Sequence, residues 1–450
     1  MREFVTDLLR RHGDDVPVFT HEHTTTHGAL RAAVAAEASR FAASGVGEGS
    51  AVALHVPPSF THLEVVLALW GLGARVISID PRLTPAEVDV LLDLTRPQFV
   101  VRGVARHDGV FRERHELVTE ERPDGRPAAT RHRLVQFTSG STGVPKVVGR
   151  STESIIREVM RFGAAEGMPG RGERMLLLNS TAQSFGLMGG LLHALAVGVR
   201  LVFAARPTAE EVLRTAARHE VDFVTGVPHH FELLAEAADR SALRTVRGAF
   251  AGGELMRPDV AERFADAYGF RVGECFGTTE TGALTMDVTG TSRPSVGRPL
   301  SDTTIRVRDG LVEVALDQSP YLDDGDHGRY LDGWFRTGDR GEFDARGNLR
   351  LLGRADSLVV VRGSNVDLTQ VEAALRAHPL VTEAIAVHDS VIEAYVSTAS
   401  DALTPEAVAA WCAERLAEFK QPQRVHVLRA LPRTSSGKLV RNPRVLADAR

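Results

Sequence analysis

Apolar residues along the first hundred positions alternate between a strand-like and a helix-like period. Short apolar runs predict buried strands at 51–56, 75–79 and 98–101. Apolar side chains at helical spacing predict helices at 28–44 and 60–72. Thr84, Pro85 and Glu87 form a further helix start, with a cap, a proline in the first turn and a carboxylate. Strands alternating with helices are typical of βαβ units and a largely parallel sheet.

The same alternation resumes after an Arg-rich polar connector at 112–132. It predicts further strands at 134–137, 176–178, 201–203, 223–225 and 246–250. One intervening helix begins at Thr208, which forms a capping-box pattern with Glu211. The apolar run at 185–199 is too short to span a bilayer, so we interpret it as a buried helix.

The pattern changes twice in the C-terminal third. From 296 to 352 short β runs and Gly/Asp turns replace the helical spacing, which predicts a β-rich subdomain. After Gly353 a separate α+β segment follows, with strands predicted at 358–361, 384–387 and 392–396 and helices at 369–377 and 405–419. The sequence therefore predicts an α/β protein. Its large N-terminal domain, residues 1–352, has parallel-type sheets layered with helices, and its small α+β C-terminal domain begins beyond 353.

Composition removes several classes of protein. The 450 residues are 43% apolar and 25% charged, with a net charge of -5, which excludes a disordered chain, a collagen and a membrane bundle. A nucleic-acid partner is disfavoured because such proteins are usually basic. Two cysteines exclude a disulfide framework, and no apolar export signal is visible near the N-terminus. We therefore expect a cytoplasmic protein without a membrane partner.

A Ser/Gly-rich segment after the predicted strand at 134–137 carries the strongest chemical signal. It runs Thr138, Ser139, Gly140, Ser141, Thr142, Gly143, Val144, Pro145 and Lys146. Glycines let consecutive N–H groups turn toward one anion, while hydroxyls and an ammonium add donors, as a polyphosphate requires. The spacing differs from a Walker A loop. Local composition alone leaves a phosphate loop and a mobile surface turn equally open.

The stretch FTSGSTGVPK resembles the phosphate loop of the adenylate-forming superfamily, which comprises acyl-CoA synthetases, peptide-synthetase adenylation domains and luciferases. Five further motifs follow in the order of that family: AGGE at 251–254, FGTTETG at 276–282, WFRTGD at 334–339, GRAD at 353–356 and LPRTSSGK at 431–438. Phe276 stands where the family usually has Tyr. Together the motifs cover nearly the whole chain, so the resemblance is specific.

The resemblance implies ATP and Mg²⁺ as cofactors and a carboxylic acid as substrate. It implies Lys438, Thr279 and Glu280 as catalytic residues, with Glu280 also a Mg²⁺ ligand. The nucleotide would contact Thr138, Ser139, Gly140, Ser141, Thr142, Gly143, Lys146, Gly252, Gly253, Glu254, Phe276, Gly277, Thr278, Asp339 and Arg354. In these roles Phe276 stacks on adenine, Asp339 accepts the ribose hydroxyls and Arg354 supports the same sugar. Taken singly, Asp339 could be a turn acid and Lys438 a solvated lysine.

The family also implies a second half-reaction. Residues 357–450 would be a mobile lid that rotates about a hinge at 353–356, where Asp356 matches the family hinge residue. Lys438 would then leave the site, and a thiol would attack the acyl-adenylate. That thiol belongs either to coenzyme A or to the phosphopantetheine of a carrier protein, since both end in the same arm. An amide-forming ligase and a degenerate nucleotide-binding protein remain alternatives.

The acid pocket is expected at Gln183, Gly186, Gly226, His229 and His230. Amino-acid activators of the family place an Asp near the position that we align with Gln183, where it pairs with the substrate ammonium. Residues 180–187 contain no carboxylate. Burial of an ammonium without a counter-charge is costly, so an aryl or short acyl acid with a hydrogen-bonding group fits better than a free α-amino acid.

Several features depart from the family or invite other interpretations. Compared with the family, a β-hairpin is expected to be trimmed at 309–314; this leaves the matched ATP motifs untouched and would alter the docking of a partner domain. His21, His23 and His27 favour a Thr-rich hairpin over a metal site, because no Cys or carboxylate cluster accompanies them. Cys275 is interpreted as a packed strand residue. The acidic run at 323–326 lacks calcium-loop spacing and is expected to be a solvated turn.

Overall fold

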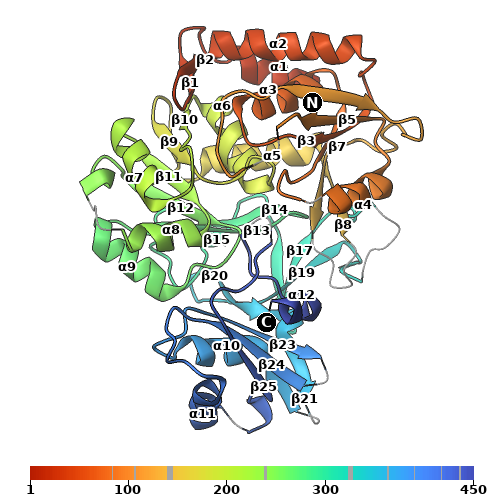
Figure 1. Ribbon diagram of the computed structural model, residues 1–450. Helices are drawn as coiled ribbons and strands as arrows, with labels where there is room; N and C mark the ends of the chain where they lie inside the picture. Colours follow the sequence, from red (N-terminus) through yellow and green to blue (C-terminus); the bar gives the residue numbers. More distant parts are fainter. Residues whose placement is uncertain are drawn as a thin grey trace. The chain divides into compact units, whose positions relative to one another are not determined.

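The chain forms two compact units (Figure 1). The computed structural model describes the chain except residues 84, 106–107, 139–144, 238–240, 323–327, 362–363, 390, 417, 435–436 and 450, and gives only the backbone of 86, 356, 358, 360, 361, 364, 365, 367, 370, 389 and 419. The first unit comprises Met1–Ile305, Val314–Phe335 and Asp344–Arg350. The second comprises Arg306–Glu313, Arg336–Phe343 and Leu351–Arg450.

A nine-stranded sheet dominates the first unit. Its order is β15 (Arg298–Pro299), β14 (Gly282–Asp287), β13 (Val272–Thr278), β12 (Gly248–Gly252), β11 (Phe223–Gly226), β9 (Arg174–Leu177), β10 (Arg200–Val202), β1 (Pro17–Thr20) and β2 (Thr24–Thr26). The strands from β13 to β1 pair in parallel. Successive strand residues face opposite sides, so Leu176 packs with α7 (Ala209–Arg218), α8 (Pro228–Ala235) and α9 (Pro258–Tyr268), whereas Met175 and Leu177 face the main core.

A second sheet has the order β6 (Leu117–Glu121), β5 (Phe99–Gly103), β3 (Ala51–His55), β4 (Arg75–Ser78), β7 (His132–Thr138) and β8 (Lys146–Ser151). Its Val52 and Val76 share one apolar cluster with strands of the first sheet and with helix α3 (Phe60–Gly71). Every α3 residue from Phe60 to Trp70 is buried, and most of them are apolar, as expected for a helix enclosed on all sides. The other helices are α1 (Arg2–Arg10), α2 (His27–Ala43), α4 (Pro85–Thr95), α5 (Thr152–Ala164) and α6 (His193–Val197).

The apolar run at 185–199 is buried and helical, but its first half is a π-helix, η1 (Gly186–Leu192), that continues into α6. A side chain at Gly189 would place its Cβ 2.7 Å from the Phe162 ring, so glycine permits this close packing. His193 interrupts the run because its Nε2 bonds to the Pro169 carbonyl at 3.0 Å. Burial lowers the pKa of His193 to about 4, which keeps it neutral.

The C-terminal third contains three smaller sheets. One has the order β16 (Ile305–Arg308), β17 (Leu311–Ala315), β19 (Trp334–Phe343) and β18 (Tyr330–Leu331), with β20 (Leu349–Arg354) beside β19. A hairpin joins β21 (Leu358–Val361) to β22 (Ser364–Asp367). In the third, β23 (Glu383–Asp389), β24 (Val391–Ser397) and β25 (Arg424–Leu428) pack α10 (Leu368–Arg376) and α11 (Pro405–Arg415) on one face; Leu431, Leu439 and α12 (Pro443–Asp448) pack on the other.

The predicted α/β class and β-rich subdomain are confirmed. The pattern missed β6 inside the polar connector, because this edge strand exposes most of its residues. The capping box at Thr208 is half formed. Thr208 accepts a bond from the Glu211 N–H, but Glu211 turns to the Ala205 N–H instead. Among the described residues, no helix is long and apolar enough to cross a membrane.

Candidate active site

Three predicted site segments emerge side by side at the carboxyl ends of β11, β12 and β13. Gly226 pairs with Ala251, and Gly252 pairs with Cys275, the neighbour of Phe276. The loops that follow these strands therefore share one edge of the sheet, the usual location of ligands in parallel sheets. Motifs separated by about fifty residues of sequence are brought together by strand register alone.

Backbone geometry explains two of the glycines at this edge. Gly253 has φ +96°, which disfavours any residue with a Cβ. A Cβ at Gly277 would lie 2.3 Å from the carbonyl oxygen of Gly282, across the β13–β14 pair. Thr278 closes the intervening turn by hydroxyl contacts with Thr281. Phe276 is buried, Thr279 is half-buried, and Glu254 is exposed.

Glu280 is a buried carboxylate without a cationic partner among the described residues. It is 9% exposed. Its Oε1 accepts a bond from the Tyr321 hydroxyl at 3.1 Å and lies 3.5 Å from the Thr138 hydroxyl, while its Oε2 has no hydrogen-bond partner in the described part of the chain. A buried carboxylate needs compensation, and hard divalent cations prefer oxygen ligands. The arrangement therefore fits the predicted Mg²⁺ ligand.

Thr138 and Lys146 face each other where the predicted phosphate loop begins and ends. They are paired residues of β7 and β8. Lys146 is 6% exposed, and its ammonium lies 5.4 Å from the centre of the Tyr321 ring. The intervening Ser139, Gly140, Ser141, Thr142 and Gly143 lie outside the described residues. The β7–β8 pair thus brings both ends of the loop close to Glu280.

Among the described residues, Tyr321 is a candidate site residue that sequence reasoning missed. It connects Glu280 through its hydroxyl with Lys146 through its ring, and it is buried at 6% exposure. It forms an isolated bridge with Val148 rather than belonging to a strand. Neither periodicity nor a matched motif marks position 321, so only the tertiary structure could reveal it.

The segment that carries Gln183 is fixed from the neighbouring sheet. Gln136 on β7 donates its amide to the Ala182 carbonyl at 3.1 Å and accepts a bond from Ser184 Oγ at 2.5 Å. Ser78 on β4 donates to the same carbonyl at 2.9 Å. The Gln183 side chain itself makes no hydrogen bond within the described residues, and Gly186 follows as the first residue of η1. The Gln183 amide is therefore available to a ligand.

The two predicted pocket histidines have different surroundings. His230 packs against Gly226, and its Nδ1 accepts the Val227 N–H at 3.2 Å. Burial, followed by the charge of His229, lowers the pKa of His230 to about 4, so the ring is neutral with its proton on Nε2. His229 is more exposed, and its Nδ1 lies 3.7 Å from Glu232, which pairs with Arg257. His230 is thus the better candidate for contact with an acid.

The second unit holds the remaining predicted residues. Arg354 Nη1 lies 3.3 Å from Asp339 Oδ1 and 3.4 Å from the Thr337 carbonyl. The Asp339 N–H bonds to Thr337 Oγ1 at 3.1 Å, and both residues lie in strand β19 on either side of Gly338, whose φ is +80°. Asp356 lies in a short 3-10 turn, η3 (Ala355–Ser357), and its side chain is outside the described set. The Lys438 carbonyl accepts a hydrogen bond from the Thr434 N–H at 2.7 Å.

The remaining groups that could have had a catalytic or binding role either contact other protein groups or are disfavoured by burial. Burial raises the pKa of the Cys275 thiol, which disfavours the nucleophilic thiolate. His23 pairs with Glu113, while His21 bonds to the Phe203 carbonyl. Arg150 is 3% exposed and forms an ion pair with Glu158, so its charge is not available at the surface. The acidic run at 323–326 lies outside the described residues.

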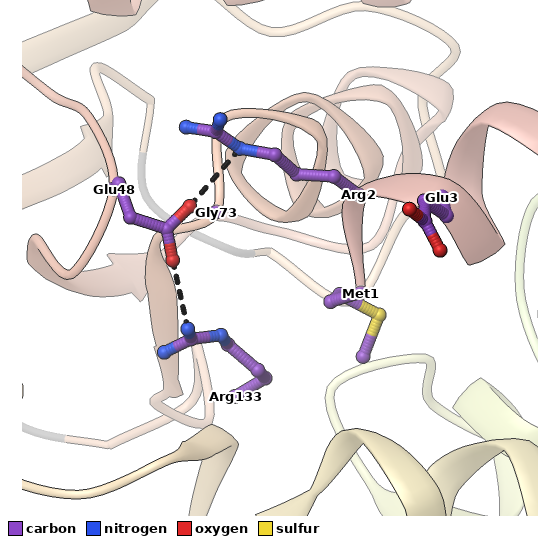
Figure 2. A pocket seen from close by; sticks show the side chains of 6 residues that line it. All are labelled: Met1, Arg2, Glu3, Glu48, Gly73 and Arg133. Carbon is purple, nitrogen blue, oxygen red and sulfur yellow. Dashed lines mark hydrogen bonds and ion pairs between the residues drawn. The ribbon is translucent and has the colours of Figure 1, made fainter.

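A surface hollow near the N-terminus is unrelated to these loops (Figure 2). It is lined by Met1, Arg2, Glu3, Glu48, Gly73 and Arg133. Glu48 lies between Arg2 at 3.1 Å and Arg133 at 2.9 Å, so these charges satisfy one another. None of the predicted site residues lines this hollow.

Comparison of the sequence and structure with known proteins identifies the family of this chain. Residues 6–319 match the AMP-binding enzyme model, and residues 370–438 match the model of the AMP-binding enzyme C-terminal domain. Sulfoacetate–CoA ligase of Cupriavidus necator is 28% identical over 93% of this chain and 92% of its own. O-Succinylbenzoate coenzyme A synthetase of Bacillus subtilis, solved with AMP, has a TM-score of 0.82 at 24% identity, covering 98% of this chain and 97% of that one. Amide bond synthetase of Marinactinospora thermotolerans has a TM-score of 0.82 at 22% identity, covering 99% of each chain. The chain belongs to the AMP-binding enzyme family.

Proposed function

We propose that this protein uses ATP to convert a carboxylic acid to an acyl-adenylate and then transfers the acyl group to the thiol of coenzyme A. Family membership supports an AMP-forming ligase. The observation that carries the proposal is Glu280, a buried carboxylate lacking a cation among the described residues, next to Thr138 at the mouth of the phosphate loop. Such a carboxylate is suited to hold a metal–nucleotide complex.

The chemistry joins two anions and then exchanges an oxygen for a sulfur. In the first step a carboxylate oxygen forms a bond to the α-phosphorus of ATP, the α–β phosphoanhydride bond breaks, and pyrophosphate leaves. In the second step a thiolate forms a bond to the acyl carbon, the acyl–phosphate bond breaks, AMP leaves, and the thiol proton passes to solvent. Positioning and charge neutralisation carry most of the first step.

The residues divide this work between them. Glu280 would hold Mg²⁺, which when bound neutralises phosphate oxygens. Thr138 and Thr279 would donate hydroxyl bonds to the phosphates, and Phe276 would stack on adenine. Asp339, held by Arg354, would accept the ribose hydroxyls. Lys438 would place its ammonium between the carboxylate and the α-phosphate.

The acid pocket favours an acid that carries no ammonium group. His230 is neutral and presents its Nε2–H as a donor, and Gln183 has an amide without a partner in the described part of the chain. Phe185 supplies an aromatic wall against Gly252, whose Cβ would come within 3.0 Å of the ring. An aryl or short acyl acid with a distal carbonyl or hydroxyl satisfies these groups.

Acid-dependent exchange of labelled pyrophosphate into ATP tests the first step. The acids are sulfoacetate, 2-succinylbenzoate, benzoate, 4-hydroxybenzoate, malonate and, as the free amino acid, phenylalanine. We expect exchange with at least one aryl or short acyl acid and none with phenylalanine. ATP binding without exchange for any of them would instead support the degenerate-binder alternative.

Acceptor identity is tested in a second assay with the acid that supports exchange. We expect thioester formation with coenzyme A. A carrier protein bearing phosphopantetheine and a primary amine are the other arms, which represent the carrier-dependent and amide-forming alternatives. Product formation with the carrier or the amine, but not with coenzyme A, would replace the proposed acceptor.

Lys438→Ala tests the role of the mobile ammonium. We expect it to abolish pyrophosphate exchange while ATP binding remains measurable by titration calorimetry, because the ammonium acts on the transition state rather than on the bound nucleotide. Unchanged exchange would refute the assigned role.

A further inference from the structure

The hairpin that carries Lys438 is held by the protein rather than left free. Pro432 and Val440 close its base by a backbone bond of 2.9 Å, and Arg433 bridges Leu439. At the tip, the Thr434 N–H donates to the Lys438 carbonyl at 2.7 Å, and the Lys438 N–H donates to Thr434 Oγ1 at 3.2 Å. The backbone of Lys438 is therefore bonded to Thr434 at both its N–H and its carbonyl.

One backbone carbonyl of the hairpin, that of Gly437, accepts a hydrogen bond from a side chain. The turn uses the Gly437 N–H, which bonds to Thr434 O at 2.9 Å, but the Gly437 carbonyl accepts from Arg433 Nη1. This carbonyl belongs to the same peptide group as the Lys438 nitrogen. The guanidinium thus fixes the plane from which the Lys438 side chain starts.

The same guanidinium is anchored to the sheet of the second unit. Arg433 Nη2 donates to Oε1 of Glu383, the first residue of β23. Arg433 is 28% and Glu383 19% exposed, so the pair is partly shielded from solvent. A planar fork can hold two acceptors at once, which a lysine cannot do.

A second ion pair anchors the far strand of the hairpin. Arg441, three residues after Lys438, grips both oxygens of Glu372, with Nη2 to Oε2 at 2.9 Å. Glu372 lies on α10, is 2% exposed and also accepts the Ala386 N–H at 3.0 Å. Both strands of the hairpin are therefore tied to the same small domain.

We propose that Arg433, oriented by Glu383, is a positioning residue that aims Lys438 for adenylation, with Arg441–Glu372 as a second anchor. This inference rests on the proposed function of Lys438. Misplacement of a catalytic group by about 1 Å costs on the order of a hundredfold in rate. The effect belongs to the first half-reaction alone, because Lys438 is expected to leave the site before the thiol attacks.

The test separates the two half-reactions in Arg433→Gln, using the acid that supports pyrophosphate exchange. We expect kcat for exchange to fall about tenfold to a hundredfold with little change in KM for ATP. Thioester formation from the chemically prepared acyl-adenylate and coenzyme A should stay within about twofold, and the melting temperature should change little. Arg429→Gln is the matched control, since Arg429 pairs with Asp401 outside the hairpin.

Two further variants, Glu383→Gln and Arg433→Lys, are used to distinguish a positioning effect from misfolding. Glu383→Gln should reproduce a weaker form of the same selective loss, and the double variant with Arg433→Gln should be no worse than Arg433→Gln alone. Unchanged exchange, or an equal loss in both half-reactions, overturns the proposal. If the wild-type protein itself exchanges pyrophosphate with no acid of the panel, the proposed function fails instead.

Discussion

The motif that contains Glu280 identifies the residue but does not reveal which side chains surround it. The motif gives the residue type, but its environment comes from Thr138 on another sheet and from Tyr321, which lies forty-one residues later in the chain. Both neighbours are hydroxyl donors to the same oxygen, which leaves the other oxygen for a ligand. Because the two carboxylate oxygens of Glu280 have different surroundings, substitutions of Glu280 and of Tyr321 test different contacts.

Glu280→Gln should lower kcat for pyrophosphate exchange on the order of a hundredfold, because it removes the negative charge that would hold the metal while keeping the shape. The required Mg²⁺ concentration should rise. Exchange measured across a Mg²⁺ titration checks both expectations.

Tyr321→Phe removes only one hydroxyl bond to Glu280 and keeps the ring beside Lys146. We expect a loss of about tenfold or less, in line with about 1 kcal/mol for one hydrogen bond. An effect as large as that of Glu280→Gln would show that Tyr321 contacts the substrate directly.

Buried histidines give the protein a pH-dependent stability. Burial lowers the pKa of His27 and His62 from 6.5 to about 4, with His12 adding to the effect at His27. Below pH 6.5 these histidines bind protons in the unfolded chain but stay neutral in the folded chain. The free energy of unfolding should therefore fall between pH 6.5 and 4 by up to about 1.4 kcal/mol per pH unit for each such histidine.

Thermal unfolding at pH 7.5, 6.5 and 5.5 measures this dependence. His27→Leu should flatten the decline, because both ring nitrogens of His27 are buried without hydrogen bonds in the described structure. A decline of equal steepness in both proteins would exclude His27 as its source.

At the scale of elements, a buried ion pair joins three of them behind the site. Arg150 on β8 and Glu158 on α5 are each 3% exposed and 2.7 Å apart. Glu158 also accepts the N–H of Ala283 on β14 at 3.0 Å. The strand that follows the predicted phosphate loop is thereby connected to the strand that follows the Glu280 turn.

Glu158→Gln should destabilise the protein by about 3–5 kcal/mol, since it leaves the buried Arg150 charge unpaired. The change in melting temperature is the measurement, with Arg157→Gln on the exposed side of α5 as the control. Replacement of both partners, Arg150→Met with Glu158→Leu, should recover much of the loss. No recovery would mean that the Ala283 bond, rather than the charge, matters most.

Strands were predicted well where a run was continuously apolar. The strands β3, β4, β5, β9 and β11 appear within a residue or two of the predicted runs, because each is buried on both faces. The predicted helix at 405–419 ends at Arg415, since Leu416 adopts an extended conformation. The π-helical turn at Gly186–Leu192 was invisible because its composition equals that of a buried α-helix.

At the scale of the whole molecule, the two matched family models fall on the two ends of the chain. The Asp339–Arg354 pair and the Lys438 hairpin belong to the second compact unit, and Glu280 belongs to the first. A lid that turns about residues 353–356 would let one pocket serve two reactions in sequence. This hinge stays a prediction.

The substitution Asp356→Pro tests the predicted hinge at 353–356. The ring of proline fixes φ and removes an N–H, so rotation about this residue should be restricted. We expect pyrophosphate exchange to persist and thioester formation from acyl-adenylate to fall at least tenfold. Equal rates in both half-reactions would place the hinge elsewhere.

The sequence by itself determined the α/β class, the order of the motifs and the residue types of the candidate site, because strand and helix periods and ligand chemistry are local properties. Only the tertiary structure decided which of these residues meet. The pairing of Gly226 with Ala251, the Tyr321 hydroxyl on Glu280 and the Arg433 grip on Gly437 depend on strand register and on contacts between distant segments. Such contacts arise from packing across the folded chain, and no local pattern of hydrophobic and polar positions encodes them.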